Sequence, residues 1–311
     1  MKSILLTGAG GFLGRQLLWQ LKDEDDFYVY AITSNPERLK EIISASNIKV
    51  VKKGDDLDWK NVDIVIHSAF ARSGISSEYI TSLEYSKDIF QNAVSNRVKA
   101  IINISSQSVY GNNQNIPWKE DAMLMPQDMY AMAKASSEII LNVLSEKSST
   151  VATNLRLSSI MLNARFVNVF VQNAIDYVPI NIIGGTQQFS FMDIRDAASA
   201  IIELIRTSQT SWDKVYNLGT GKQNSIIEIA DIIRDVAKSY VEKKVIINIE
   251  KKDIPPNSYM DIRKFTELTN WSAKYDICDM VKSQFEYLFD KKQKGENIKF
   301  SNNYPFTYLW Q

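Results

Sequence analysis

Three observations predict an α/β fold in which a doubly wound parallel sheet is joined to a smaller second domain. The chain has 311 residues, of which 45% are apolar, so it can bury one large core and a smaller one. Apolar strand-like runs alternate with helical segments through its first half, which is typical of a parallel sheet with crossover helices. A glycine-rich turn directly follows the first apolar run, where a strand has to turn tightly into a helix.

The expected elements follow in order along the chain. Strands are predicted at 3–6, 28–32, 49–51, 63–66, 100–104 and 151–156. Helices are predicted from residue 12 and at 36–46, 77–95 and 129–145. Sheets of this kind bind ligands at the carboxyl ends of their strands, so the residues directly after each strand are the candidates for chemistry.

The turn after the first strand has the properties of a phosphate-binding loop. Gly8, Gly11 and Gly14 allow a tight turn, a close approach of the backbone to phosphate, and close packing of helix on strand. The helix that begins near Phe12 would direct its free N–H groups and the positive end of its dipole at the anion. The spacing is Gly-x-x-Gly-x-x-Gly, because position 13 is Leu13. We therefore expect a dinucleotide pyrophosphate at this turn.

The end of the second strand bears on the choice of dinucleotide. An acidic residue about twenty positions past the glycines would bind a ribose 2′-hydroxyl and favour NAD. Here the strand ends in Thr33, Ser34 and Asn35, with Arg38 close behind. These residues leave room for a 2′-phosphate, so the choice between NAD and NADP stays open and leans to NADP.

Candidate catalytic residues follow the fifth strand. Tyr130 and Lys134 are four residues apart, which places them on one face of a helix. An ammonium beside a phenol favours the phenolate and lowers the tyrosine pKa toward the range of a general base. A serine hydroxyl from the strand end can hydrogen-bond the same substrate oxygen. The same Tyr-x-x-x-Lys spacing at Tyr240 and Tyr287 is interpreted as two surface pairs, because no serine-ended strand precedes it.

Composition excludes several classes of protein. The net charge is zero and no long basic run occurs, so a nucleic-acid partner is not expected. Cys278 is the only cysteine and His67 the only histidine, which excludes intrachain disulfides, thiolate zinc sites and histidine-rich metal sites. No apolar run approaches ~20 residues and the first strand starts at residue 3, so neither a signal peptide nor a membrane span is expected. We expect a cytoplasmic protein.

The motifs together resemble the extended short-chain dehydrogenase/reductases, in particular the NAD-dependent epimerase/dehydratase family. The resemblance lies in residues 7–14, 63–69, 105–111, 130–134, 191–193, 215–221 and 261–271. It implies a Rossmann-type domain at 1–160 plus about 190–225, a smaller α/β substrate-binding domain at about 161–189 plus 226–295, and an aromatic tail at 296–311. These motifs are specific for the family and not for its substrate.

The resemblance also assigns roles to residues. It implies that Ser106 orients the substrate, that Tyr130 is the acid/base, and that Lys134 holds the nicotinamide ribose and tunes Tyr130. The other residues expected at the cofactor are Gly8, Gly11, Phe12, Leu13, Gly14, Ser34, Asp56, His67 and Ala69. For His67, a purely structural role as a hydrogen-bonded residue at a strand end is the alternative.

Departures from the family pattern reduce the number of activities that we expect for this chain. Dehydratases place an Asp-Glu pair where this chain has Gln107 and Ser108, which disfavours a 4,6-dehydratase and leaves 4-epimerases and keto-sugar reductases.

The expected substrate contacts are Ser106, Ser159, Gln187 and Lys251. Ser159 replaces a usual asparagine and Gln187 a usual arginine, which weakens the expected hold on a diphosphate. Lys251 or Lys252 could compensate.

Three hypotheses follow. The first is a UDP-sugar 4-epimerase that acts on a hexose or an N-acetylhexosamine, such as UDP-glucose or UDP-N-acetylglucosamine, with bound NAD. The second is an NAD(P)H-dependent 4-keto-sugar nucleotide reductase, and the third a non-catalytic cofactor-sensing protein. By resemblance we also expect a homodimer formed through helices 77–95 and 129–145.

Overall fold

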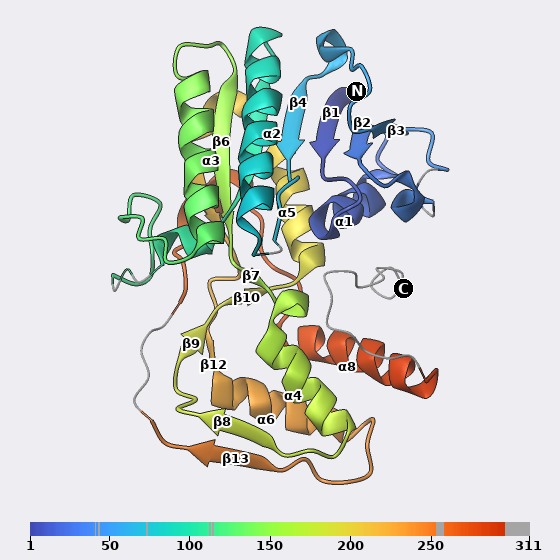
Figure 1. Cartoon of the computed structure of the whole chain (residues 1–311), viewed down its shortest axis with the longest axis vertical. Helices are drawn as coiled ribbons and strands as arrows, with labels where there is room; N and C mark the ends of the chain where they lie inside the picture. Colours follow the sequence, from blue (N-terminus) through green and yellow to red (C-terminus); the bar gives the residue numbers. More distant parts are fainter. Residues whose placement is uncertain are drawn as a thin grey trace.

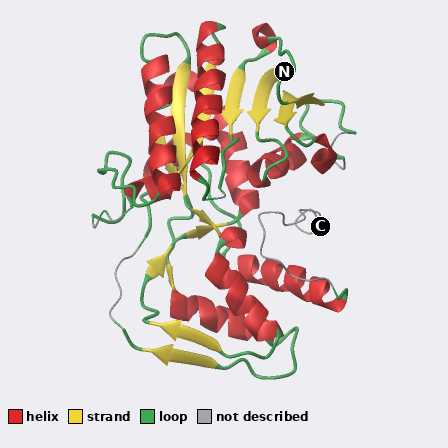
Figure 2. Ribbon diagram, in the orientation of Figure 1, coloured by secondary structure: helices red, strands yellow, loops and turns green. Residues whose placement is uncertain are grey.

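The computed structural model describes residues 1–40, 42, 44–72, 74–111, 113, 115–252 and 258–295. These residues form two units, one built on the large sheet and one on small sheets and helices (Figures 1 and 2). The tail at 296–311, which the sequence sets apart, lies outside the described residues. Within the described ranges, every helix is too short or too polar to cross a membrane.

The large unit contains a seven-stranded parallel sheet with the order β11-β6-β5-β4-β1-β2-β3. Its strands are β1 (Lys2–Thr7), β2 (Phe27–Thr33), β3 (Ile48–Lys52), β4 (Ile64–His67), β5 (Ala100–Ser106), β6 (Val151–Leu157) and β11 (Val215–Leu218). The six strands predicted from the sequence are all present, and β11 adds a seventh beside β6. The strand order reverses between β1 and β4, so the predicted doubly wound sheet is confirmed and has its ligand-binding switch point there.

Helices cover both faces of the sheet because alternate side chains of each strand are buried on opposite faces. Ile4 and Leu6 of β1 contribute to one core and Leu5 to another. The helices of the large unit are α1 (Phe12–Leu21), α2 (Ser76–Ser95), α3 (Met129–Ser145) and α5 (Ile194–Arg206). The pair α1 and α5 covers the face of Ile4, and the pair α2 and α3 covers the face of Leu5.

One predicted helix is wrong. In the described part of segment 36–46, only the 3-10 turn η1 (Pro36–Leu39) is helical, and turns follow it. The side-chain amide of Asn47 donates hydrogen bonds to the carbonyls of Leu21 and Phe27. This anchor fixes the chain directly before β3, and in the described residues of the segment the backbone makes successive three-residue turn bonds, such as Ile42 N–H to the Leu39 carbonyl at 2.8 Å, in place of helical ones.

The second unit has its own core, which lies between a two-stranded parallel sheet and three helices. It comprises β8 (Ile180–Ile183), β13 (Ile247–Glu250), α4 (Arg165–Ile175), α6 (Ile226–Ala237) and α8 (Ile277–Gln293). Val171, Ile229 and Phe285 from the three helices are buried together. Two short pairings lie between the units, β7 (Ser159–Ile160) with β10 (Phe191–Met192) and β9 (Gln188–Phe189) with β12 (Asn224–Ser225).

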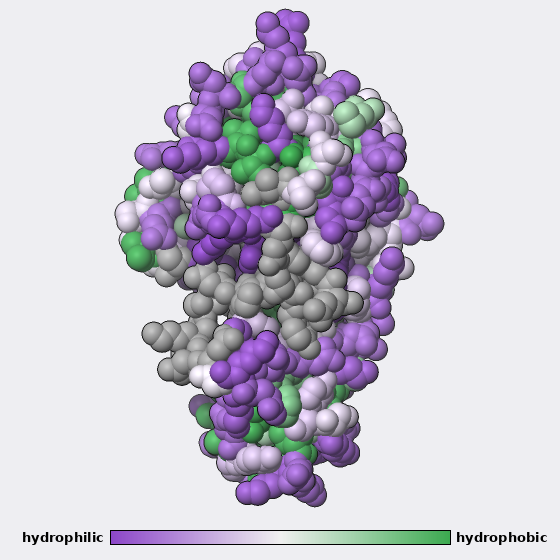
Figure 3. Space-filling view, turned by 90° about the vertical axis from the view of Figure 1, so that its right-hand side faces the viewer, coloured by the Kyte–Doolittle hydropathy of each residue, from purple (hydrophilic) through white to green (hydrophobic). Residues whose placement is uncertain are grey.

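The helix α7 (Arg263–Thr269) differs from the expected division of the chain. It belongs by position to the segment 226–295, yet Phe265 and Trp271 are buried in the core of the large sheet. The chain therefore returns from the second unit to the first before it forms α8. The side of the molecule that carries β3 and α8 is mostly hydrophilic, with one group of apolar residues in its upper part and another near its lower end (Figure 3).

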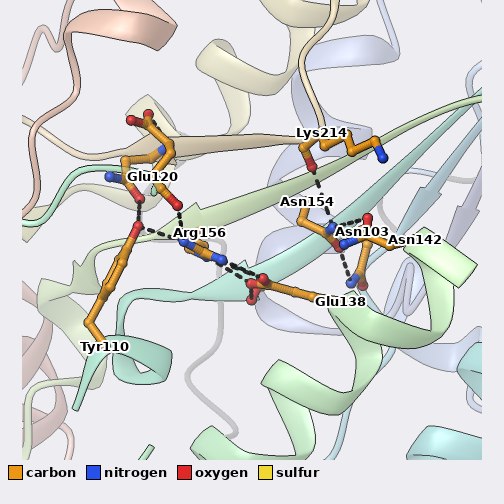
Figure 4. A network of polar contacts seen from close by, with 10 residues as sticks. Asn103, Tyr110, Glu120, Glu138, Asn142, Asn154, Arg156 and Lys214 are labelled. Carbon is orange, nitrogen blue, oxygen red and sulfur yellow. Dashed lines mark hydrogen bonds and ion pairs between the residues drawn. The ribbon is translucent and has the colours of Figure 1, made fainter. Parts of the chain in front are cut away.

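A buried ion pair joins the sheet to α3 (Figure 4). Arg156 Nη2 of β6 lies 2.7 Å from Glu138 Oε2 of α3, and Arg156 Nε donates to Glu138 Oε1 at 3.0 Å. Arg156 Nη1 also donates to the Tyr110 hydroxyl at 2.8 Å and to the Glu120 carbonyl at 3.0 Å. Ser105 donates to Glu138. The network replaces the water that both charged groups lose on burial.

Loss of one partner of this ion pair should be costly. We predict that Arg156→Met lowers the free energy of unfolding by about 3–5 kcal/mol, because Glu138 would stay buried without its counter-charge. Urea denaturation measures this change. Arg206→Met is the control, since Arg206 pairs with Glu24 at the surface and its loss should cost at most about 1 kcal/mol. Equal costs for the two variants would contradict the role of the buried pair.

Candidate active site

The glycine turn between β1 and α1 leaves no space for side chains. Gly8 has φ +69°, and a Cβ on it would lie 2.7 Å from the backbone nitrogen of Ala69. A Cβ on Gly14 would lie 2.2 Å from the carbonyl oxygen of Gly8. Gly11 precedes α1, so no side chain caps the N-terminus of the helix, the end to which anions bind. The donors and the space fit the pyrophosphate of a dinucleotide.

A cavity of about 520 Å³ opens directly beside this turn. Four of the predicted cofactor residues line it, namely Gly8, Gly11, Ser34 and Ala69. Phe12, Leu13 and Gly14 form the first turn of α1 next to it. Asp56 is exposed in the loop after β3 and does not line the cavity.

His67 is buried beneath this region. One ring nitrogen hydrogen-bonds the Thr7 hydroxyl at 2.9 Å, and the other hydrogen-bonds the Ser86 hydroxyl at 2.8 Å. Burial, together with the charge of Lys134, lowers the pKa of His67 to about 3. A neutral ring that donates one hydrogen bond and accepts the other holds β1, β4 and α2 together. The ring does not line the cavity.

The serine, tyrosine and lysine predicted from the sequence come from β5 and the start of α3. Ser106 is the last residue of β5, and its hydroxyl accepts a hydrogen bond from the Ser108 hydroxyl at 3.0 Å. Tyr130 lies in the first turn of α3, which Asp128 caps by accepting the N–H of Ala131 at 2.7 Å. The Lys134 Nζ lies 5.9 Å from the centre of the Tyr130 ring.

The pKa of Tyr130 differs from the expectation. Burial raises the pKa of Tyr130, and the charge of Arg72 and a hydrogen bond with Ser106 oppose that rise. Burial lowers the pKa of Lys134 to about 7, against the opposing effect of Glu138. Arg72 follows β4 and was not identified from the sequence, although its position after a strand could have suggested it.

Lys134 is held firmly. Its Nζ donates to the carbonyl of Ile104 at 2.8 Å and lies 3.9 Å from the centre of the Phe70 ring. Phe70 also contacts Tyr130, with 6.3 Å between ring centres, and it lines the cavity. Phe70 therefore lies between the cavity and the pair of Tyr130 and Lys134, and sequence reasoning missed it.

The predicted substrate residues are in different settings. Ser159 lies beside the end of β5, because the side-chain amide of Gln107 donates to its hydroxyl at 2.9 Å. Gln187 is buried, and its side-chain oxygen Oε1 accepts a hydrogen bond from the backbone N–H of Gly185 in the same turn. Lys251 is exposed directly after β13. The structure thus joins Ser159 to the neighbour of Ser106, whereas Gln187 serves its own turn. Among the described residues, no group of histidine, cysteine and acidic side chains could hold a metal ion.

Comparisons with known proteins agree with this geometry. An uncharacterized protein of Methanocaldococcus jannaschii is 26% identical over 94% of this chain and 97% of its own length. A putative UDP-glucose 4-epimerase of the same organism is 23% identical over 90% of this chain and 96% of its own. Both relatives match nearly end to end.

Solved structures show the same fold. The UDP-N-acetylglucosamine 4-epimerase from Bacillus cereus matches with a TM-score of 0.75 and 22% identity, over 96% of this chain and 99% of its own. The UDP-glucuronic acid 4-epimerase from Bacillus cereus in complex with NAD matches with a TM-score of 0.77 and 22% identity, over 94% and 99%. Residues 4–219 match the NAD dependent epimerase/dehydratase family. With this match over most of its length, the chain belongs to that family of enzymes.

Proposed function

We propose that this chain is a nucleotide-sugar 4-epimerase that acts on a UDP-hexose or a UDP-N-acetylhexosamine. The observation that carries the proposal is the grouping of Ser106, Tyr130 and Lys134 at the end of β5, where Tyr130 contacts Phe70, a ring that lines the cavity beside the glycine turn. The 4-epimerases among the similar structures support the choice of reaction. The sequence also favours a cytoplasmic location, which stays a prediction.

The residues of the chain divide the proton chemistry between them. NAD, when bound, supplies a hydride acceptor that later returns the hydride. Tyr130 Oη takes the proton of the sugar 4-hydroxyl, and Ser106 holds the same oxygen in line. Tyr130 has to accept that proton as a phenolate and becomes a phenol, and the neighbouring Lys134 ammonium favours the phenolate that this step needs. The 4-keto sugar then turns over, and Tyr130 returns the proton to the same oxygen.

The residues after Ser106 favour epimerisation over dehydration. Elimination of water needs an additional acid and base near the sugar, whereas Gln107 and Ser108 follow Ser106 here. The Gln107 amide donates a hydrogen bond to the Ser159 hydroxyl, and the Ser108 hydroxyl donates one to the Ser106 hydroxyl. These two side chains therefore support the site and add no titratable group to it.

A 4-keto-sugar reductase is the second candidate. It would use only the return half of the same cycle, with the same Ser106, Tyr130 and Lys134. The observation that favours it is the wall of the cavity at β2, where the lining side chains that the structure describes include Arg38 and Lys53 and no carboxylate. Such a wall suits NADPH, the usual reductant for biosynthesis.

Two incubations separate the candidates. We expect the protein to convert UDP-N-acetylglucosamine or UDP-glucose to the 4-epimer without added reductant, since an epimerase regenerates its cofactor in each turnover. Chromatography of the sugars measures the conversion, and mass spectrometry of the denatured supernatant identifies bound dinucleotide. Oxidation of NADPH by a 4-keto sugar, with no epimer formed, would establish the reductase in its place.

Replacement of the proposed acid/base should slow turnover by orders of magnitude and keep the fold. We predict that Tyr130→Phe lowers kcat by about 10²–10⁴-fold, the range of general acid–base effects, with unchanged dinucleotide affinity. The measurement is the initial rate of epimer formation.

Tyr240→Phe is the matched control for this variant. Tyr240 has the same spacing to a lysine, but it lies in the second unit. Its hydroxyl donates a hydrogen bond to the Glu286 carboxylate at 3.2 Å, and its ring stacks on Phe285. Its kcat should stay within about twofold of the parent value, as for surface changes away from a site. A large loss in Tyr240→Phe, or none in Tyr130→Phe, would contradict the assignment.

We also propose that the chain forms a homodimer through α2 and α3, which lie side by side at one edge of the molecule (Figure 1). Met132, Ile139 and Val143 follow one another along one side of α3 and are 51%, 60% and 67% exposed. A second copy would cover this apolar stripe.

A charge on the stripe should separate the copies. We predict that Ile139→Glu converts a dimer to a monomer in mass photometry, because it would bury a carboxylate in an apolar interface. Ile183→Glu is the control, since Ile183 is similarly exposed on β8, away from α3. A parent chain that is already monomeric would overturn the proposal.

A further inference from the structure

The ammonium of Lys134 is buried beside an aromatic ring. Lys134 is 4% exposed, and its Nζ donates to the carbonyl of Ile104 and lies 3.9 Å from the centre of the Phe70 ring. The carboxylate of Glu138, one helical turn further along α3, is bound by Arg156 at 2.7 Å. We propose that the face of the Phe70 ring stabilises the Lys134 ammonium, which makes Phe70 a positioning residue for the acid/base chemistry. This inference rests on the roles assigned in the proposed function.

The backbone fixes the place of this ring independently of the lysine. Phe70 lies in the loop between β4 and α2, where it lines the cofactor cavity. The N–H of Ala71 donates to the Ser82 hydroxyl at 3.0 Å. The N–H of Gly74 donates to the Tyr79 hydroxyl, also at 3.0 Å. Both hydroxyls belong to α2, so two hydrogen bonds in the residues that follow Phe70 tie the loop to that helix. The scaffold therefore holds the ring, and the ammonium lies against it.

The same ring packs against the proposed acid/base. The rings of Phe70 and Tyr130 meet edge to face, with 6.3 Å between their centres and 81° between their planes. Tyr79 of α2 also contacts the Tyr130 ring, with 6.2 Å between the centres. Aromatic pairs at such distances attract each other beyond the area that they bury. Phe70 thus contacts both members of the reactive pair, and its position sets that of the Lys134 ammonium relative to the phenol.

The charges around Lys134 make the contact with the ring important. Burial lowers the pKa of Lys134 to about 7, Glu138 opposes this effect, and the charge of Arg72 adds to it. His67 of β4 adds no charge, because burial lowers its pKa to about 3, and burial raises the pKa of Tyr130. The face of a ring attracts an ammonium and not a neutral amine. The contact therefore favours the charged form of a lysine that would otherwise lose its proton near neutral pH.

A double-mutant cycle tests the contact without reference to catalysis. Urea denaturation of the parent chain, Phe70→Leu, Lys134→Met and the double variant gives the four equilibrium constants of unfolding. We expect Phe70→Leu to raise this constant about tenfold more in the parent chain than in the Lys134→Met background, because only the parent has an ammonium for the ring to stabilise.

Ring fluorination tests the consequence for turnover. Fluorinated phenylalanines at position 70 keep the shape of the ring and withdraw electrons from its face, so they weaken its attraction for a cation. We expect the kcat of epimer formation to fall stepwise with the number of fluorines, by about tenfold for three, with KM changed less. The fall should be largest above about pH 7 and small at about pH 6, where a lysine with a pKa of about 7 keeps its proton without help from the ring.

Lys53→Met is the matched control for the cycle. Lys53 lines the same cavity, but its Nζ lies 4.2 Å from the centre of a different ring, that of Tyr85. The effects of Lys53→Met and Phe70→Leu on unfolding should therefore simply add. Additive effects of Phe70→Leu and Lys134→Met would overturn the inference, and so would a fluorine series in which kcat stays constant. If the parent chain epimerises neither sugar, the proposed function fails, and the cycle alone then decides whether the ring stabilises the ammonium.

Discussion

The position of the reactive groups depends on the hydrogen bonds between the end of β5 and the inner side of α3. Asn103 accepts a bond from Ser137, Ile104 from Lys134, and Ser105 donates to Glu138. Each of these consecutive residues of the strand is thus tied to the helix. The next residue is Ser106, so the strand delivers its hydroxyl to the start of α3 in a fixed register.

The turn of α3 from Lys134 to Glu138 contributes both to the stability of the fold and to the proposed reaction. Glu138 is paired with Arg156, one helical turn beyond Lys134. The pair anchors the helix, and its carboxylate favours the charged form of a lysine that burial would otherwise neutralise. A buried charge network is costly to build, and here it lies where it can also serve a neighbouring ammonium.

Local patterns in the sequence predict the strands, the glycine turn and the shared helix face of Tyr130 and Lys134, because spacing along one element determines each of them. The role of Ser106 came from the family resemblance. Local patterns fail where the position of a residue depends on a contact with a residue far away in the sequence. The return of the chain at Asn47 depends on carbonyls twenty or more residues earlier, and the position of Lys53, directly after β3, depends on the ring of Tyr85 in α2. The family pattern identified the site but not these contacts.

The placement of α7 makes the two units depend on each other for their complete cores. The chain crosses from the large unit to the small one and back, and α7 returns Phe265 to the sheet core between β13 and α8 of the other unit. Each core is therefore completed by segments that the other core separates in sequence. The second unit therefore cannot be excised or exchanged as one contiguous segment of the chain.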